Sequence, residues 1–533
     1  MMGSAPLLAL LLLMSDGTRA LVSSPSFRPQ WFHRRTVPPA AVSESTLSDA
    51  IWAEQWWPLC FTAHTSKKAP IAIQLLGAEL VLWWNSADGA WHCTRDQCSH
   101  RLAPLSEGRI ADDGKCIECP YHGWQFEGEG GRCTRMPQRP TGEENESSVR
   151  QERAAVLALP TCEAQGMVWV WAGPLFDGAA PQPPSDSSVG PFVIDAIERP
   201  GVEHSDYSRD LHMDWSTLCE NVMDPAHLPY THHKTISKRD KAQPIPFANL
   251  SPLEPEGFSA DRPTEGWPGK VTFRAPHLVL AETHRATDGA SGSVGAGSGQ
   301  FSDWNVVYAV PTSPGKCRLL VRVCFEVAKM KPPLKWIIGF AFTKQPTWLT
   351  HLGNHVILED DNPFLHVQGH FYREGRVGDV SSDNGGIGMA NGGKLAPDWQ
   401  RRLYTPCSSD AMVIAFRRWI DKFTEGKGAA WSKFSSFNPC AATQHRASRQ
   451  EVLERAKSHV EHCAACSGAL SNAIKGRHAA DSAVVVALLI ASFVSRLRPT
   501  AFALAAVAYA VARACASLEQ RMTHGIYPPP RNA

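Results

Sequence analysis

Two short stretches of the chain each place a cysteine close to a histidine. The first is Cys98-x-His100, the second is Cys119-x-x-His122, and eighteen residues separate them. Two thiolates and two imidazoles suit a tetrahedral zinc ion, and they also suit an iron–sulfur cluster. Either metal requires a fold that brings two loops together. Zinc held through Cys116-x-x-Cys119 is an alternative, but it would leave His122 and the first loop unexplained.

The residues around these pairs alternate between apolar and polar, as β-strands do. "IWAEQWWPLCFTAH" (51–64) and "IAIQLLGAELVLWWNSADGAWHC" (71–93) alternate with period two, and "MVWVWAGP" (167–174) is typical of a further strand. The sequence therefore predicts a compact β-rich domain over residues 50–175, with the Cys/His pairs on its loops.

A Pro/Ser-rich linker at 178–191 separates this domain from a second one. Residues 192–440 mix strand patterns such as "RLLVRVCFEVA" with helical patterns near 211–223, 346–360 and 408–422. The predicted fold class is α+β.

The C-terminal region has a helical pattern over 447–478, which contains Cys463-x-x-Cys466. Two apolar stretches follow, separated by "SRLRP", and each is shorter than the ~20 apolar residues of a spanning helix. Flanking Ala, Ser and Thr extend both, so we expect a transmembrane hairpin over 479–520. Two helices lying on the membrane or packing on the protein are the alternative.

The first 45 residues have the composition of a leader. An apolar run at 5–14 is followed by small residues, as in a signal peptide, and the next segment is rich in Arg and Ser without an acidic residue until Glu44. This pattern resembles the bipartite signal and transit peptide of plastid proteins in algae with complex plastids. A secreted protein is the alternative.

Cysteine usage and charge narrow the function further. Fifteen cysteines, an odd number, favour metal binding and thiol redox chemistry in a reduced compartment over a disulfide framework. Cys93, Cys116 and Cys133 leave other ligand sets open near the Cys/His pairs. With 53 basic and 52 acidic residues, the chain has no global field that would attract nucleic acid.

A second group of candidate ligands lies in "ENVMDPAHLPYTH" (220–232). His227 and His232 are five residues apart, so a helix followed by a turn brings both to one ion. On spacing alone, two polar helix residues are the better interpretation. "VILEDDNPFLHVQ" (356–368) adds three acidic residues as candidate third ligands: Glu359, Asp360 and Asp361.

"CSHRLAPLSEGRI" and "CPYHGWQF" closely resemble the two loops of the Rieske [2Fe–2S] family. The resemblance implies a [2Fe–2S] cluster with Cys98 and Cys119 on one iron and His100 and His122 on the other.

"DPAHLPYTH" in turn resembles the D-x-x-H-x-x-x-x-H motif of Rieske non-haem iron oxygenases. That resemblance implies a helix-grip-like catalytic domain with a mononuclear Fe(II) held by His227, His232 and a carboxylate. Asp361 aligns with the family's ligand, and Asp360 is the alternative. It also implies that Asp224 bridges the two metal sites for electron transfer between neighbouring subunits of a homotrimer.

Three stretches and the tail are similar to the plastid branch that contains pheophorbide a oxygenase, the Rieske protein of the inner-envelope translocon and a protochlorophyllide-linked relative. The stretches are "ENVMDPAHLPYTHH", "DDNPFLHVQ" and "WSKFSSFNP". This branch implies thioredoxin-responsive, redox-regulatory thiols at Cys463 and Cys466. We expect His462 and Lys457 to lower their pKa. Two ordinary helix cysteines are the alternative.

The resemblance implies a monooxygenase of chlorophyll breakdown. Ferredoxin would supply electrons, and O2 would supply an oxygen atom to a chlorophyll-derived tetrapyrrole, with ring opening of pheophorbide a as the main expectation. Methyl oxidation of the chlorophyllide a oxygenase type and a redox-sensing envelope protein remain alternatives. The expected location is the plastid envelope or thylakoid membrane, with the catalytic domains in the stroma.

Overall fold

The structure is a computed structural model that describes residues 51–139, 152–176, 183, 190–264, 268–286, 300–340, 345–374, 399, 403–424 and 446–532. The predicted leader and the stretch "WSKFSSFNP" lie outside these residues.

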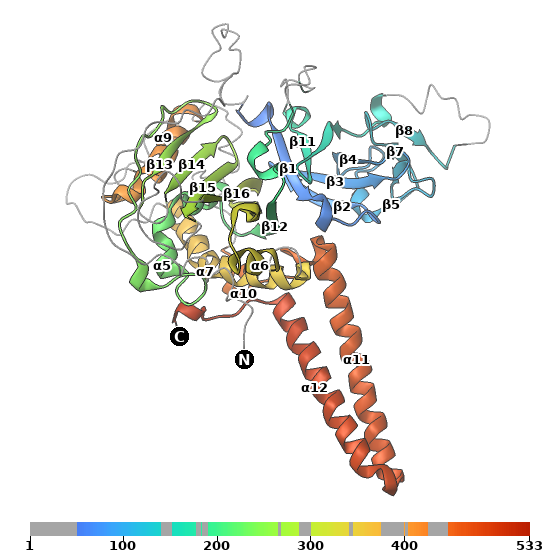
Figure 1. The fold of residues 1–533 in the computed structure, drawn as a ribbon. Coiled ribbons are helices and arrows are strands. Elements are labelled where there is room, and N and C mark those ends of the chain that lie inside the picture. The colour runs from blue at the N-terminus through green and yellow to red at the C-terminus, as the bar shows by residue number, and fades with distance from the viewer. Residues whose placement is uncertain are drawn as a thin grey trace, which may run out of the picture.

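Three small antiparallel sheets build the N-terminal domain (Figure 1). Their strand orders are β1-β11-β10, β2-β3-β4-β9 and β5-β6-β7-β8. The strands are β1 (Trp56–Phe61), β2 (Ile71–Leu75), β3 (Ala78–Asn85), β4 (Ala90–Arg95), β5 (Arg109–Ile110), β6 (Cys116–Glu118), β7 (Gln125–Glu127), β8 (Cys133–Arg135), β9 (Ala158–Leu159), β10 (Thr161–Ala164) and β11 (Met167–Trp171).

The predicted strands at 71–93 form the hairpins of this domain. Leu75 pairs with Ala78, so only two residues connect β2 and β3. Leu76 and Gly77 both have positive φ, at 51° and 75°. A two-residue loop with two positive φ angles matches the twist of the flanking strands, and this turn fixes their register.

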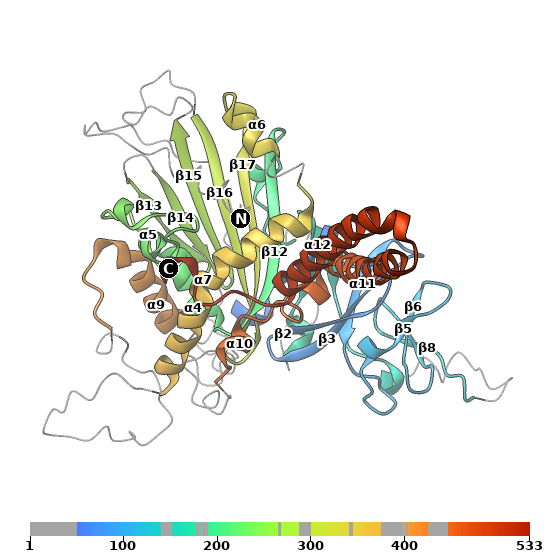
Figure 2. The ribbon, with the colours of Figure 1, turned by 90° about the horizontal axis from the view of Figure 1, so that it is seen from below.

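The second domain is a six-stranded antiparallel sheet covered on one face by helices (Figure 2). Its strand order is β12-β17-β16-β15-β14-β13. The elements are β12 (Val202–Leu211), β13 (Gly257–Arg262), β14 (Gly269–Arg274), β15 (Leu278–Ala286), β16 (Gln300–Ser313), β17 (Lys316–Glu326), α4 (Trp215–Met223), α5 (Leu228–Thr231), α6 (Leu334–Gly339), α7 (Thr347–Glu374) and α9 (Ala411–Phe423). The predicted α+β class is confirmed.

One hydrophobic core runs through both domains. Trp52 stacks on Trp57 at 5.9 Å between ring centroids and meets Trp215 of α4 edge-on at 5.3 Å. All three rings are fully buried. Because buried aromatic rings contribute several kcal/mol each, the interface holds the two domains as one body.

The C-terminal region begins with α10 (Arg449–Val452) and continues as two long antiparallel helices that project from the body (Figure 1). They are α11 (Ala464–Phe493) and α12 (Arg498–Thr523). The thiol segment and the first apolar stretch thus share one continuous helix. Both helices are long and apolar enough to cross a membrane, with only 11% and 17% of their apolar windows buried.

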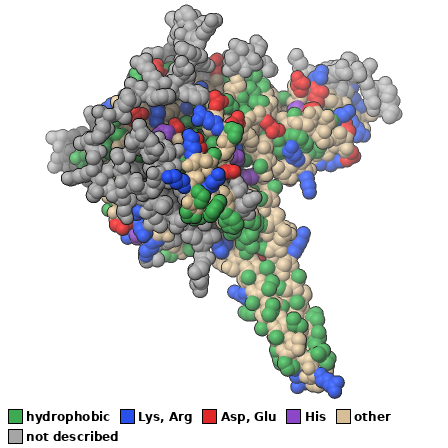
Figure 3. Space-filling view, viewed as in Figure 1, with side chains coloured by type: hydrophobic (Ala, Val, Ile, Leu, Met, Phe, Trp, Pro, Cys, Tyr) green, Lys and Arg blue, Asp and Glu red, His purple; other side chains and the backbone are tan. Residues whose placement is uncertain are grey.

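Small residues line the contact between the two helices. Beyond Cys466, the buried residues of α11 are Ala473, Ala480, Ala487 and Ala491, and those of α12 include Ala501, Ala505 and Ala512. Such a seam lets two backbones approach closely, as it does between helices in lipid. Hydrophobic side chains cover much of the hairpin's outer surface, and basic side chains lie at its tip (Figure 3).

Candidate metal centres

Two turns present the Cys/His pairs. In the first, the Cys98 N–H donates to Ala103 O at 2.9 Å and the Leu102 N–H donates to Cys98 O at 2.8 Å. In the second, which joins β6 to β7, the Cys119 N–H donates to Trp124 O at 2.8 Å. Gly123 closes this turn with φ +70°, a conformation that glycine adopts without strain.

The two imidazoles of the pairs lie next to each other, and so do the two thiols. The His100 and His122 rings are 4.6 Å apart between centroids, and Trp124 stacks on His100 at 4.6 Å with an interplanar angle of 3°. The thiols of Cys98 and Cys119 are buried. Burial raises the pKa of Cys98 to about 11, and a bound cation is what stabilises such a sulfur as thiolate.

The donor set also fits a [2Fe–2S] cluster. The Nδ1 atom of His100 is buried and has no hydrogen-bond partner. A buried ring nitrogen without a partner is costly unless it serves as a ligand. The cluster requires two thiolates and two imidazole nitrogens. The two buried thiols and the two adjacent imidazoles, including the unpartnered Nδ1 of His100, match this requirement.

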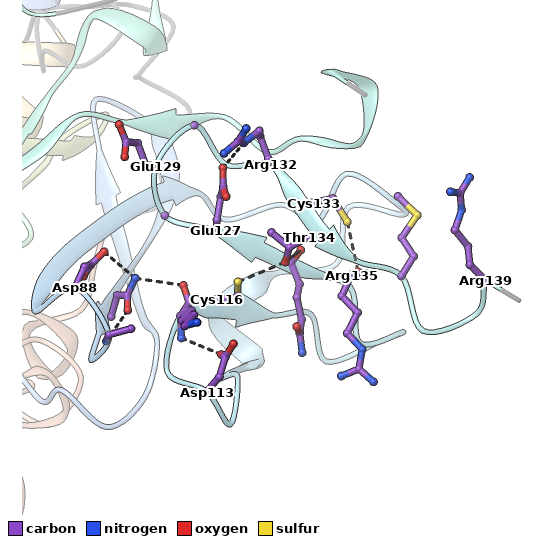
Figure 4. Close-up of a pocket in the computed structure, with 17 residues that line it drawn as sticks. Asp88, Asp113, Cys116, Glu127, Glu129, Arg132, Cys133, Thr134, Arg135 and Arg139 are labelled. Carbon is purple, nitrogen blue, oxygen red and sulfur yellow. Dashed lines mark hydrogen bonds and ion pairs between the residues drawn. The ribbon is translucent and has the colours of Figure 1, made fainter. Parts of the chain in front are cut away.

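The three thiols that left other ligand sets open, Cys93, Cys116 and Cys133, have other surroundings. Cys116 Sγ lies 3.4 Å from Thr134 Oγ1, and Cys133 Sγ lies 3.4 Å from Arg135 O. Both line a pocket beside β6, β7 and β8, together with Asp88, Asp113 and Glu127 (Figure 4). Cys93 is buried in the shared core. Because Cys116 Sγ contacts Thr134, nothing within the described residues supports the zinc alternative through Cys116-x-x-Cys119.

The second centre is built around the end of α4. Asp214 caps the start of this helix by accepting from Ser216 N, and Asp224 follows its last residue. The Asp224 carboxylate accepts from Ala226 N at 2.8 Å, and the backbone carbonyl of Asp224 contacts His227 Nδ1. That carbonyl can only accept, so the contact leaves the Nε2 atom of His227 as the free ligand atom.

The third member of this centre comes from α7. His232 Nε2 lies 3.1 Å from Asp361 Oδ2, and His227 Nε2 lies 3.9 Å from Asp361 Oδ1. One donor atom from each of the three residues lies within 4.8 Å of the others. Asp361 and His232 are buried, and His227 is partly buried. This set matches the facial triad of two His and one carboxylate that holds non-haem iron.

Asp360 has a different position from its neighbour. Its Oδ2 atom lies 3.3 Å from His232 Nδ1, the ring atom that points away from Asp361. Burial lowers the pKa of His232, but the two carboxylates outweigh it and raise the value to about 9. The site therefore favours a cation between the imidazoles and Asp361, and Asp360 orients the His232 ring.

Within one chain the two centres are far apart. The Cys/His loops belong to the β5–β8 sheet, at the opposite end of the molecule from α5 in both views (Figures 1 and 2). Asp224 is therefore not a bridge between the two centres of the same chain.

The C-terminal thiols lie in unexpected surroundings. Cys463 and Cys466 are both buried, with 2% exposure, and their neighbours are His351 of α7 and His459. Hydrogen bonds with Cys466, His351 and His459 lower the pKa of Cys463. We expected His462 and Lys457 to have this effect. His351 and His459 have it, although no sequence motif places either of them beside the thiols.

A [2Fe–2S] domain followed by a His/His/Asp iron site in an α+β domain defines a Rieske non-haem iron oxygenase, an oxidoreductase. Residues 55–156 match the Rieske [2Fe-2S] domain family, and residues 273–377 match the pheophorbide a oxygenase family. The chain is 30% identical over 421 residues to the chloroplastic pheophorbide a oxygenase of Oryza sativa subsp. japonica, covering 79% of this chain and 73% of that protein. It belongs to the pheophorbide a oxygenase family.

Other relatives widen the range of substrates in the family. The chain is 28% identical over 493 residues to flavonoid 8-hydroxylase 2, chloroplastic, of Ocimum basilicum, covering 88% of this chain and 84% of that protein. Protein TIC 55 and chlorophyllide a oxygenase, both chloroplastic, are further relatives. Among solved structures, dicamba monooxygenase bound to dicamba is 17% identical with a TM-score of 0.50, covering 69% of this chain and 97% of that one. This likeness shows the shared fold.

Proposed function

We propose that the protein is a monooxygenase that inserts oxygen from O2 into pheophorbide a and opens its macrocycle. The observation that carries the proposal is the convergence of His227, His232 and Asp361 in a chain of this family. The matched pheophorbide a oxygenase region, 273–377, contains α7 up to residue 374 and so includes Asp361.

The residues around the second centre prepare it for iron. When bound, the cluster and the mononuclear iron supply one-electron reduction and O2 activation. Asp224 O and Asp360 fix the two imidazoles from behind, and Asn221 Nδ2 donates to Asp361 Oδ1 at 3.3 Å. Three protein ligands on one face of an ion leave its other positions open to O2 and substrate.

We further propose that electrons cross between subunits. The two centres of one chain lie at opposite ends, so a neighbouring copy has to bring its Cys/His loops to this chain's Asp224. A closed ring of three copies meets this requirement at every interface. Burial raises the pKa of Asp224, which suits a carboxyl group that hydrogen-bonds across such an interface. Ferredoxin is the proposed electron donor.

We propose that the hairpin anchors the protein in the plastid envelope or thylakoid membrane, with both metal domains in the stroma. The exposed apolar surface of α11 and α12 and the chloroplastic relatives support this location. A bipartite leader over residues 1–45 would deliver the chain, with domains at 50–175, 192–440, 447–478 and 479–520. Thioredoxin is the proposed partner of Cys463 and Cys466.

Oxygen labelling tests the reaction. Full-length protein with reduced ferredoxin and 18O2 is given pheophorbide a, chlorophyllide a or a flavone, and products are analysed by mass and absorption spectroscopy. We expect an 18O-labelled product only from pheophorbide a, with loss of the macrocycle's red absorption band because ring opening breaks the conjugation. Methyl oxidation would retain that band. The proposal fails if the protein consumes no O2 in the presence of pheophorbide a while ferredoxin reduces its cluster normally.

A further inference from the structure

We propose that His351, His459, Cys463 and Cys466 form a structural zinc site that fastens the base of the C-terminal hairpin to the catalytic domain. This third metal centre is separate from both iron centres. All four side chains are buried, with 1% exposure for each histidine and 2% for each cysteine. Four such ligands are the Cys₂His₂ set of structural zinc sites.

The distances between the ligand atoms fit one tetrahedral ion. The Nδ1 atom of His351 lies 3.0 Å from His459 Nε2, 3.6 Å from Cys463 Sγ and 3.4 Å from Cys466 Sγ. His459 Nε2 lies 3.3 Å from Cys466 Sγ. Zinc bond lengths place ligand atoms of a tetrahedron about 3.3 Å apart for two nitrogens and about 3.6 Å apart for nitrogen and sulfur.

The far side of each imidazole shows which nitrogen is free to bind. His351 Nε2 lies 3.0 Å from the backbone oxygen of Asp206, and His459 Nδ1 contacts the backbone oxygen of Ser208. A carbonyl oxygen only accepts, so both of these ring nitrogens carry hydrogen. The lone pairs of His351 Nδ1 and His459 Nε2 therefore point at the same spot. A second hydrogen bond from the far nitrogen is the usual support of a metal-bound histidine.

A disulfide between Cys463 and Cys466 would explain the position of the two thiols but not that of the two imidazoles. It would leave two imidazole lone pairs facing each other at 3.0 Å in a buried place, which is repulsive unless a cation lies between them. Both thiols are free rather than bridged. Zinc would keep both sulfurs as thiolates and exclude a disulfide, so thioredoxin control of this pair would first require loss of the metal.

The ligands come from segments that otherwise lie on different parts of the chain. His351 lies on α7, His459 precedes α11, and Cys463 and Cys466 are at the start of that helix. The hydrogen-bonded carbonyls belong to β12. Asp361 is ten residues beyond His351 on α7, about 15 Å along the helix axis. A zinc ion here would fix the hairpin relative to the helix that carries the iron ligand.

Metal analysis of the full chain, purified without oxygen in detergent, tests this site. We expect one zinc per chain beside three irons, and a zinc X-ray absorption spectrum with two sulfur and two nitrogen neighbours. His459→Ala should lower zinc content about tenfold or more, because three ligands remain. His462→Ala, at an exposed neighbouring imidazole, should not change it. A second matched pair uses the thiols. Cys463→Ser should lower the zinc content, whereas Cys407→Ser, at an exposed thiol, should not change it.

Wild-type protein alone can overturn the proposal, even if the variants fail to fold. Any one of three results would overturn it: less than about one tenth of an equivalent of zinc, a zinc spectrum without sulfur neighbours, or a Cys463–Cys466 disulfide in the anaerobic protein. Zinc content does not depend on turnover, so failure of the proposed oxygenase reaction leaves this test unaffected.

Discussion

The two iron centres are assembled in different ways. The four proposed cluster ligands all lie between Cys98 and His122, on two turns attached to neighbouring short strands. The proposed mononuclear centre takes two ligands, His227 and His232, from the two short helices that follow α4, and the third from α7, 129 residues beyond His232. Local turns therefore build the first centre, whereas the second exists only when α7 is packed correctly. Damage to long-range packing should affect the second centre first.

The largest expected effect separates the two centres in function. His227→Ala removes a ligand of the second centre and leaves the first untouched. We expect turnover to fall by more than the roughly 100-fold typical of residues that only support a ligand, while the cluster's visible and EPR signals keep their intensity. If the variant loses the cluster signals as well, the two centres are not built independently.

Neighbouring carboxylates on α7 test which of them holds the metal. Asp361→Ala should lose the mononuclear iron, so that iron analysis gives two irons per chain. Asp360→Ala should keep it with roughly 10–100-fold weaker affinity, because it removes only the support of His232. The reverse order of effects would make Asp360 the ligand.

The difference between a site built from local turns and one built by long-range packing also explains which ligands the sequence could predict. The cluster ligands are predictable because each pair lies within one turn. His227 and His232 have a recognisable spacing only beside the first centre, and three consecutive acidic residues left the third ligand open. The predicted helix at 346–360 instead runs from Thr347 to Glu374 with Pro363 inside it. Proline usually ends a helix, so only tertiary packing shows that α7 continues.

His351 and His459 show the limit of local patterns most clearly. They are 108 residues apart, and each could be a surface histidine. Their convergence depends on the antiparallel sheet that presents β12 carbonyls to both rings. Sequence spacing carries no signal for such a set.

A buried ion-pair network should stabilise the packing of α7 against the rest of the catalytic domain. Glu359 of α7 accepts from Arg209 at 2.8 Å and from Arg455 at 2.7 Å, and all three side chains are buried. Glu359→Gln would leave two guanidinium groups without their charge partner, which costs about 3–5 kcal/mol of unfolding free energy. Glu461→Gln, at an exposed carboxylate, is the control. In urea, iron release from the second centre should shift to lower concentration while the cluster signal does not.

Acid should also weaken the contact between the N-terminal β domain and the catalytic domain. We expect a smaller loss of unfolding free energy than for Glu359→Gln. Arg322 of β17 binds both carboxylate oxygens of Asp206 at 2.7 Å and donates to Gln165 O at 2.7 Å, in the turn between β10 and β11. Burial alone would raise the pKa of Asp206, but the hydrogen bonds from Arg322 hold it at about 2.

This lowered pKa makes the stability of the fold depend on pH. The charged Asp206 carboxylate stabilises the fold at pH values above its unfolded-state pKa, near 3.8. That contribution is lost as pH falls toward 2. The full loss should amount to about 2 kcal/mol, of which about half, roughly 1 kcal/mol, falls between pH 6 and pH 3. Urea unfolding at pH 6 and pH 3 would measure it, and Asp206→Asn should be less stable than wild type at pH 6 but closer to it at pH 3. An unchanged difference at the two pH values would mean that the charge of Asp206 does not hold the two regions together.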